Sequence, residues 1–284
     1  MEHPVKGVDH VFLLVEDLDR SQEQFRRLGF TVSPRGLHSA HKGSANHTIM
    51  FPEDYFELLG LIADTEQNAS RREMLARDGQ GLHAVACRID DAAAAAQALD
   101  ALGIATSGLS DFSRPVPLPG GGEGLAAFST LLFEPEEIPL GLAFMCQHRT
   151  REMVWQPELL DHPNGAAGLA GILAGVAEPE TSARRYARLF AAGLASAIEG
   201  GFEVRTGSAP LLFLSEEALA ARYGGLDMTS TPRNAFAAMQ VLAPDLDKVR
   251  RLLGAAEIPF VVTKEGIAVD PAHGSGAVVE FVAR

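Results

Sequence analysis

Hydrophobic and polar positions follow the same order four times along the chain. Each repeat begins with an apolar run typical of a β-strand and continues through an acidic turn into an amphipathic helix. About three short apolar or alternating runs follow each helix, such as HTIMFP and YFELLGLI after the first one. The pattern therefore predicts four βαβββ modules, whose first strands begin near residues 8, 82, 169 and 236.

The register of the repeat is set by its acidic turns. The turn residues align at offsets of 73, 161 and 228 residues, and they are Asp17, Asp90, Glu178 and Asp245. At the same offsets the first strands carry His10, His83, Gly171 and Ala238. A side chain with metal-binding chemistry therefore recurs in the first two modules and is missing from the last two.

One βαβββ module leaves one sheet face apolar, so each module must pair with another to bury that face. Four modules predict an α+β protein of two paired halves. We expect an N-terminal pair of modules over residues 1–148, a linker over 149–165 that contains QPELLDHPNG, and a C-terminal pair over 166–284.

Composition fits a globular protein, with 46% hydrophobic and 21% charged residues. The net charge of −13 argues against nucleic acid or an anionic membrane as a partner. The two cysteines, Cys87 and Cys146, stand in apolar runs and are expected to be buried and reduced. No secretory signal or membrane-spanning run is apparent, so a cytoplasmic location is expected.

Two groups of residues carry a family resemblance. The opening segment VDHVFLLVEDLD and the strand YFELLGL resemble the vicinal oxygen chelate superfamily, which includes glyoxalase I, extradiol dioxygenases and bleomycin-resistance proteins. GLHSAHKGSANHTIMF at 36–51 and WQPELLDHPNGA at 155–166 resemble the glyoxalase-like domain family. The resemblance implies cup-shaped mixed β-sheets with the helices outside.

In this superfamily the first and last strands of each module can supply ligands to a divalent metal inside the cup. Carried over to this chain, the resemblance implies His10, Glu57 and His83 as metal ligands. The fourth position falls within residues 140–147, where no carboxylate stands. In the C-terminal half only Glu280 remains, so that half is expected to be vestigial as a metal site.

Two imidazoles and one carboxylate leave coordination positions open, an arrangement that suits Fe, Mn, Ni or Zn. Such a metal acts as a Lewis acid on a substrate bound through two neighbouring oxygens. The competing interpretation is a fold of this family that has no metal and binds its ligand directly.

Further polar residues are candidates for the same cup. Candidates for proton transfer are His47 and His148, although a histidine such as His47 can equally well make a backbone hydrogen bond. The only tryptophan can either cap the pocket or fix the linker to the core. Candidates for substrate contact are Arg35, His38, Asn46, Tyr55 and Trp155.

Three functions remain open from the sequence. The first is a glyoxalase-like, metal-dependent lyase or isomerase acting on a small molecule, and the missing fourth ligand argues against glyoxalase I activity itself. The second is an Fe(II) extradiol-type dioxygenase, and the third is a non-catalytic ligand-binding or resistance protein. The expected partners are a small-molecule substrate and, in a homodimer, a second copy of the chain.

Overall fold

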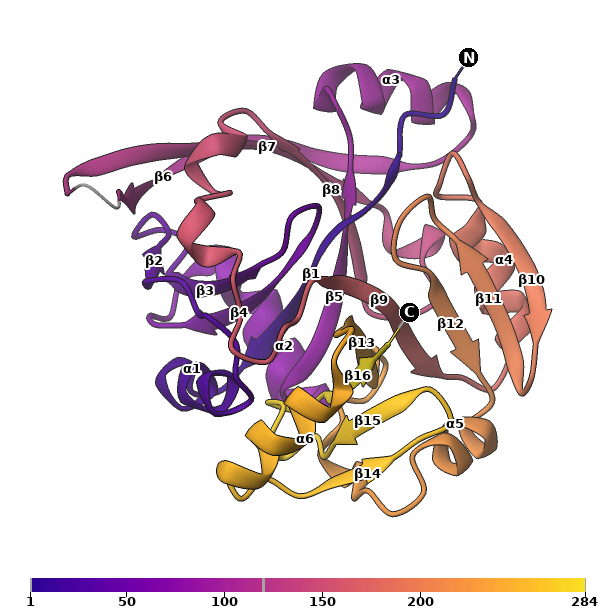
Figure 1. The fold of residues 1–284 in the computed structure, drawn as a ribbon. Helices are drawn as coiled ribbons and strands as arrows, with labels where there is room; N and C mark the ends of the chain where they lie inside the picture. The colour runs from indigo at the N-terminus through magenta and orange to yellow at the C-terminus, as the bar shows by residue number, and fades with distance from the viewer. Residues whose placement is uncertain (1, 119–120, 284) are drawn as a thin grey trace.

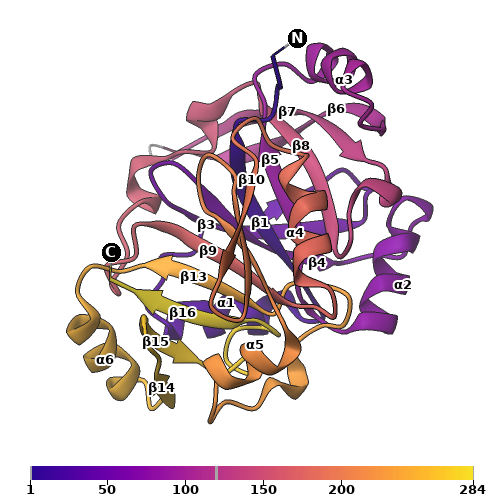
Figure 2. The same ribbon diagram turned by 90° about the vertical axis from the view of Figure 1, so that its right-hand side faces the viewer.

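A computed structural model describes residues 2–118 and 121–283. It contains two eight-stranded mixed β-sheets, with the α-helices on the outside of the molecule (Figures 1 and 2). The predicted α+β class and the plan of four paired modules are confirmed, because each sheet combines the strands of two consecutive modules.

The first sheet has the strand order β2-β3-β4-β1-β5-β8-β7-β6. At its centre β1 pairs with β5 in antiparallel fashion, so the first strands of modules one and two lie side by side. Strands β2 and β6, at opposite ends of this order, also lie side by side, and the sheet forms a nearly closed cup. The strands are β1 (Gly7–Val15), β2 (Gly36–Leu37), β3 (Ser44–Met50), β4 (Tyr55–Leu61), β5 (Gly81–Arg88), β6 (Thr106–Pro117), β7 (Glu123–Phe133) and β8 (Leu142–His148).

The second sheet repeats this order as β10-β11-β12-β9-β13-β16-β15-β14. Its central strands β9 and β13 pair antiparallel, as β1 and β5 do. The strands are β9 (Gly168–Gly175), β10 (Leu194–Ile198), β11 (Gly201–Arg205), β12 (Leu211–Leu214), β13 (Ala238–Leu242), β14 (Phe260–Val262), β15 (Gly266–Val269) and β16 (Val278–Val282).

The acidic turns of the repeat begin helices. The carboxylates of Asp17 and Asp245 accept hydrogen bonds from the backbone N–H three residues later, which is the usual N-cap interaction. In the second module the cap is Asp91 rather than the neighbouring Asp90. The helices are α1 (Leu18–Arg27), α2 (Ala69–Asp78), α3 (Ala92–Ala101), α4 (Pro179–Ala187), α5 (Glu216–Arg222) and α6 (Leu246–Ala255).

The two sheets share one hydrophobic core, in which Phe30 stacks on Phe281 with ring centroids 5.7 Å apart. The linker also joins the halves, since Asn164 donates a hydrogen bond to the carbonyl of Leu28. The proposed division at residues 149–165 remains a prediction; the strands of the first sheet end before it and those of the second begin after it. None of the helices in the described part of the chain has the length and apolarity needed to span a bilayer.

Candidate functional site

The cup of the first sheet encloses a cavity of about 160 Å³. A cavity of about 150 Å³ holds a molecule the size of benzene, so this cavity suits a small organic ligand. Side chains from β1, β3, β4, β6, β7 and β8, together with α2, line its wall. The predicted site residues on this wall are His10, His38, Asn46, Tyr55 and Glu57.

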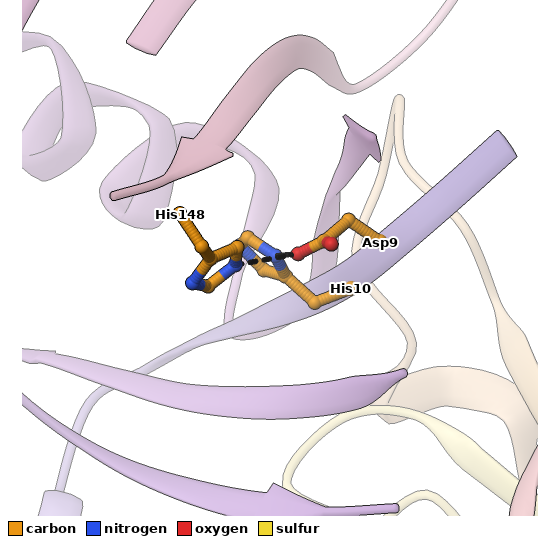
Figure 3. A group of neighbouring side chains, drawn as sticks. All are labelled: Asp9, His10 and His148. Carbon is orange, nitrogen blue, oxygen red and sulfur yellow. Dashed lines mark hydrogen bonds and ion pairs between the residues drawn. The ribbon is translucent and has the colours of Figure 1, made fainter. Parts of the chain in front are cut away.

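Beside this cavity, Asp9 bridges two histidines from opposite sides of the cup (Figure 3). Its Oδ2 lies 2.8 Å from Nδ1 of His10 and 2.9 Å from Nε2 of His148. His10 comes from β1, whereas His148 ends β8. The three side chains form the compact Asp-His-His group of the described residues that could hold a metal ion.

A β-bulge makes this arrangement possible. Val8 pairs with Cys87 and His10 pairs with Ala86, so Asp9 is an extra residue in β1 with no partner in the register. Neighbouring residues in a regular strand point to opposite faces, and a bulge breaks that alternation. The sequence prediction missed Asp9 because it assumed regular alternation, and the adjacent Asp-His pair was the signal available.

The Asp9 carboxyl group is held in its ionised form. Burial alone would raise the pKa of Asp9, but hydrogen bonds from His10 and His148 outweigh burial and hold that pKa well below its ordinary value of 3.8. Since an ionised carboxylate only accepts, both imidazoles donate to Asp9. Nδ1 of His148 is buried and has no hydrogen-bond partner among the described residues.

This donor set fits a divalent metal ion. Two ligand atoms in adjacent positions around an ion, each about 2.1 Å from it, lie roughly 3 Å apart. The separations of Asp9 Oδ2 from the two histidine nitrogens, 2.8 and 2.9 Å, match that spacing. Two imidazoles and a carboxylate also form the type of ligand set that leaves positions open for substrate.

His83 does not join this group. The residue opposite His10 on β5 is Ala86, and His83 lies at a second register shift further along the strand. Its Nε2 donates to the carbonyl of Gly79 at 2.7 Å, and His83 is not among the residues that line the described cavity. The expectation that the His10 and His83 rings meet is therefore wrong, because bulges in both strands displace the two residues from direct pairing.

Glu57 lies on the cavity wall but outside the Asp-His-His group. It accepts a hydrogen bond from Nδ2 of Asn46 at 2.9 Å, as the alternation of β3 and β4 allows. His38 faces the same space, and burial lowers its pKa to about 4, so its imidazole is neutral at pH 7. Tyr55 stacks on His10 with ring centroids 4.3 Å apart, and burial raises the pKa of its hydroxyl well above 10.

Three other predicted residues lie outside the cavity wall. His47 occupies the opposite face of β3, where its Nδ1 donates to the carbonyl of Ser33 at 2.8 Å. Arg35 is exposed and pairs with Asp19. Trp155 donates to the carbonyl of Phe51 at 2.9 Å and thereby attaches the linker to the cup.

The sequence prediction also missed three basic residues on the cavity wall: Lys42, Arg71 and Arg114. Arg114 follows Phe112 and precedes Val116 at two-residue spacing, and alternation places all three on the inner face of β6. That spacing was a usable signal. No comparable pattern marks Lys42 or Arg71.

In the second sheet, the equivalent central positions are occupied differently. Gly171 pairs with Gln240, which in turn pairs with Glu280, just as His10 pairs with Ala86 and Ala86 with Phe144. Glu280 is fully buried and accepts hydrogen bonds from Gln240, Arg222, Tyr223 and Thr263. This carboxylate is satisfied by its own protein neighbours.

Comparison with known proteins agrees with the two-cup architecture. Residues 8–190 match the family model described as a glyoxalase-like domain. No curated protein matches the sequence. The fold is similar to that of a hypothetical protein from Staphylococcus aureus, with 12% identity over 96% of this chain and 98% of that chain and a TM-score of 0.65.

A mutant of 4-hydroxymandelate synthase from Streptomyces coelicolor is also similar, with 12% identity over 98% of this chain and 92% of that chain and a TM-score of 0.53. At such identities the likeness concerns the fold alone. It identifies the architecture as that of the vicinal oxygen chelate superfamily.

Proposed function

The chain belongs to the glyoxalase-like domain family, and we propose that its N-terminal cavity is the active site of a metal-dependent enzyme of the lyase or isomerase class. The observation that carries this proposal is the Asp9–His10–His148 group beside the cavity. The proposed substrate is a small molecule with oxygens on neighbouring atoms, of a size that the cavity admits.

We assign the metal to Asp9, His10 and His148, which replaces the set of His10, Glu57 and His83 expected from the sequence. A divalent ion bound there would supply Lewis-acid stabilisation of charge that develops on a substrate oxygen. His10 is the member of this group that also lines the cavity, so it connects the group with the substrate space.

The cavity wall supplies the groups for proton transfer. Glu57 is the proposed proton acceptor, since it is the one acidic side chain among the described residues of the wall. Asn46 holds it in place through the 2.9 Å hydrogen bond. The Tyr55 hydroxyl keeps its proton at neutral pH because burial raises its pKa, so it can donate a hydrogen bond to a substrate oxygen. The surrounding apolar side chains exclude water.

The decisive experiment is elemental analysis of protein purified without chelator and without an affinity metal. We expect about one divalent ion per chain, and its loss in Asp9→Asn and His148→Gln variants. His83→Gln is the matched control, because His83 is a buried histidine of the same half that donates to a backbone carbonyl outside the cavity. It should retain the ion.

Two further measurements separate the alternatives. Oxygen consumption together with bound iron would favour the dioxygenase, whereas proton exchange between solvent and a carbonyl substrate without oxygen consumption supports the lyase or isomerase. Folded protein that never binds a divalent ion, at any concentration short of precipitation, would contradict the metal-dependent proposal and favour the ligand-binding function.

A further inference from the structure

Positive charge gathers on the wall of the N-terminal cavity. Lys42, Arg71 and Arg114 line it, while Glu57 is the single acidic side chain among the described lining residues. His38 adds no charge at pH 7, because burial lowers its pKa to about 4. The wall therefore has more cationic than anionic side chains, although the chain as a whole has a net charge of −13.

Arg114 is the most informative of these residues. Its side chain belongs to a residue only 8% exposed, yet it makes no hydrogen bond or ion pair with any residue in the described part of the chain. A buried charge normally has a partner, since leaving it unpaired costs several kcal/mol, on the order of 3–5. Glu57 does not fill this role, because its hydrogen bond comes from Asn46.

The fold makes room for this guanidinium group. A Cβ atom on Gly36 would lie 2.7 Å from Nη1 of Arg114 and 2.4 Å from Oδ1 of Asn46. Glycine at position 36 thus lets Arg114 of β6 lie against the backbone of β2, where the two edges of the cup meet. Oδ1 of Asn46 is buried there without a hydrogen-bond partner among the described residues.

The other two cations surround an aromatic surface. Arg71 of α2 also makes no hydrogen bond or ion pair with the described residues, and burial lowers its pKa. Nζ of Lys42 lies 3.2 Å from the ring centroid of Phe112, which stacks on Phe128 at 5.0 Å. Cationic and aromatic groups are therefore adjacent on one wall.

We propose that this wall binds an oxyanion of the ligand, a carboxylate or a phosphate group, through Arg114 and Arg71, while the apolar body of the ligand packs on Phe112 and Phe128. Guanidinium groups match both oxyanions in geometry and charge, and their hydrogen bonds to anions are about twice as strong as neutral ones. This inference deepens the proposed function by defining the substrate class, but the binding itself requires neither metal nor reaction.

The test is titration calorimetry at pH 7 in the presence of EDTA, with benzoate, phenyl phosphate and uncharged benzamide as probes. We expect at least one of the two anions to bind about tenfold more tightly than benzamide or better. Whichever anion binds more tightly identifies the oxyanion. Because no metal is present, this result is independent of the proposed metal chemistry.

Arg114→Met should weaken binding of the preferred anion about tenfold or more, and Arg71→Met should weaken it in the same direction. The thermal midpoint of Arg114→Met should be no lower than that of the wild type, because the substitution removes a buried charge that has no protein partner. Arg149→Met is the matched control, since Arg149 is exposed and pairs with Asp111 outside the cavity wall. Binding of benzamide as tightly as both anions, or unchanged anion binding by folded Arg114→Met, would overturn the proposal.

Discussion

Asp9 and His10 are neighbours in one β-strand, yet the Asp9 carboxylate accepts a hydrogen bond from the His10 imidazole at 2.8 Å. Regular alternation would separate the two side chains by the full thickness of the sheet. The bulge at Asp9 removes that separation and brings His148 into the same group, with its Nε2 2.9 Å from the carboxylate. A local irregularity of the backbone therefore assembles the candidate site.

Replacing Asp9 tests this arrangement through stability. Asp9→Ala leaves two buried imidazole N–H groups without an acceptor, and each such group costs roughly 1–3 kcal/mol. We expect the free energy of unfolding to fall by about 2–5 kcal/mol in urea titrations with EDTA present. Asp19→Ala on the exposed surface serves as the control and should change it by about 0.5 kcal/mol or less. An equally small change for Asp9→Ala would mean that the group contributes nothing to the fold.

Periodicity made much of this structure predictable. The four aligned turns identified the modules, and alternation placed Asn46 and Thr48 of β3 on the cavity side and His47 on the other. Both results depend on regular repeats, in which sequence spacing translates directly into position. The central pairing of β1 with β5 followed from the same reasoning.

Register at the bulges could not be predicted in this way. An extra residue in β1 and another in β5 shift the pairing, so His10 faces Ala86 although His10 and His83 match in the sequence repeat. A one-residue shift reverses the face of every later side chain. The contribution of His148 was equally hidden, because it depends on Asp9 lying on the inner side.

Glu280 provides a second prediction, which concerns the C-terminal half. Glu280→Ala should lower the free energy of unfolding by about 3–5 kcal/mol, because it leaves the Arg222 guanidinium group without its buried partner. Glu280→Gln should cost less, since an amide oxygen still accepts hydrogen bonds from Tyr223 or Gln240. Chemical denaturation measures both values. In any folded fraction the metal content should equal that of the wild type, and its loss would place the metal in the wrong half.

Trp155 provides a third prediction, which concerns the linker. Its ring lies 4.9 Å from His148 and 5.4 Å from Tyr55 between centroids, and its N–H binds the Phe51 carbonyl. Trp155→Phe should cost about 0.5–1.5 kcal/mol for the lost hydrogen bond, while Trp155→Ala should cost about 3–5 kcal/mol because packing is also lost. Equal values for the two variants, measured by urea unfolding, would contradict this separation of roles.

Asp54 provides a fourth prediction, on how stability depends on pH. This residue is buried at the junction of the two sheets, where its Oδ1 accepts a hydrogen bond from the backbone N–H of Leu169 at 3.0 Å. Burial raises its pKa from 3.8 to about 7, although the Leu169 hydrogen bond and the charge of Arg88 oppose the shift. The folded protein therefore keeps this proton to a higher pH than the unfolded chain does.

The sign of the effect follows from that difference. Below pH 4 Asp54 is protonated in both states, and its contribution to stability is fully present; between pH 4 and 7 only the unfolded chain releases the proton, so stability falls as pH rises. The total loss is about 4 kcal/mol at most. Asp54→Asn keeps an acceptor for Leu169 and has no proton to lose. Relative to the wild type, this variant should therefore gain stability steadily from pH 4 to pH 8. Urea unfolding across that range measures the difference, and a constant difference would show that Asp54 does not titrate there.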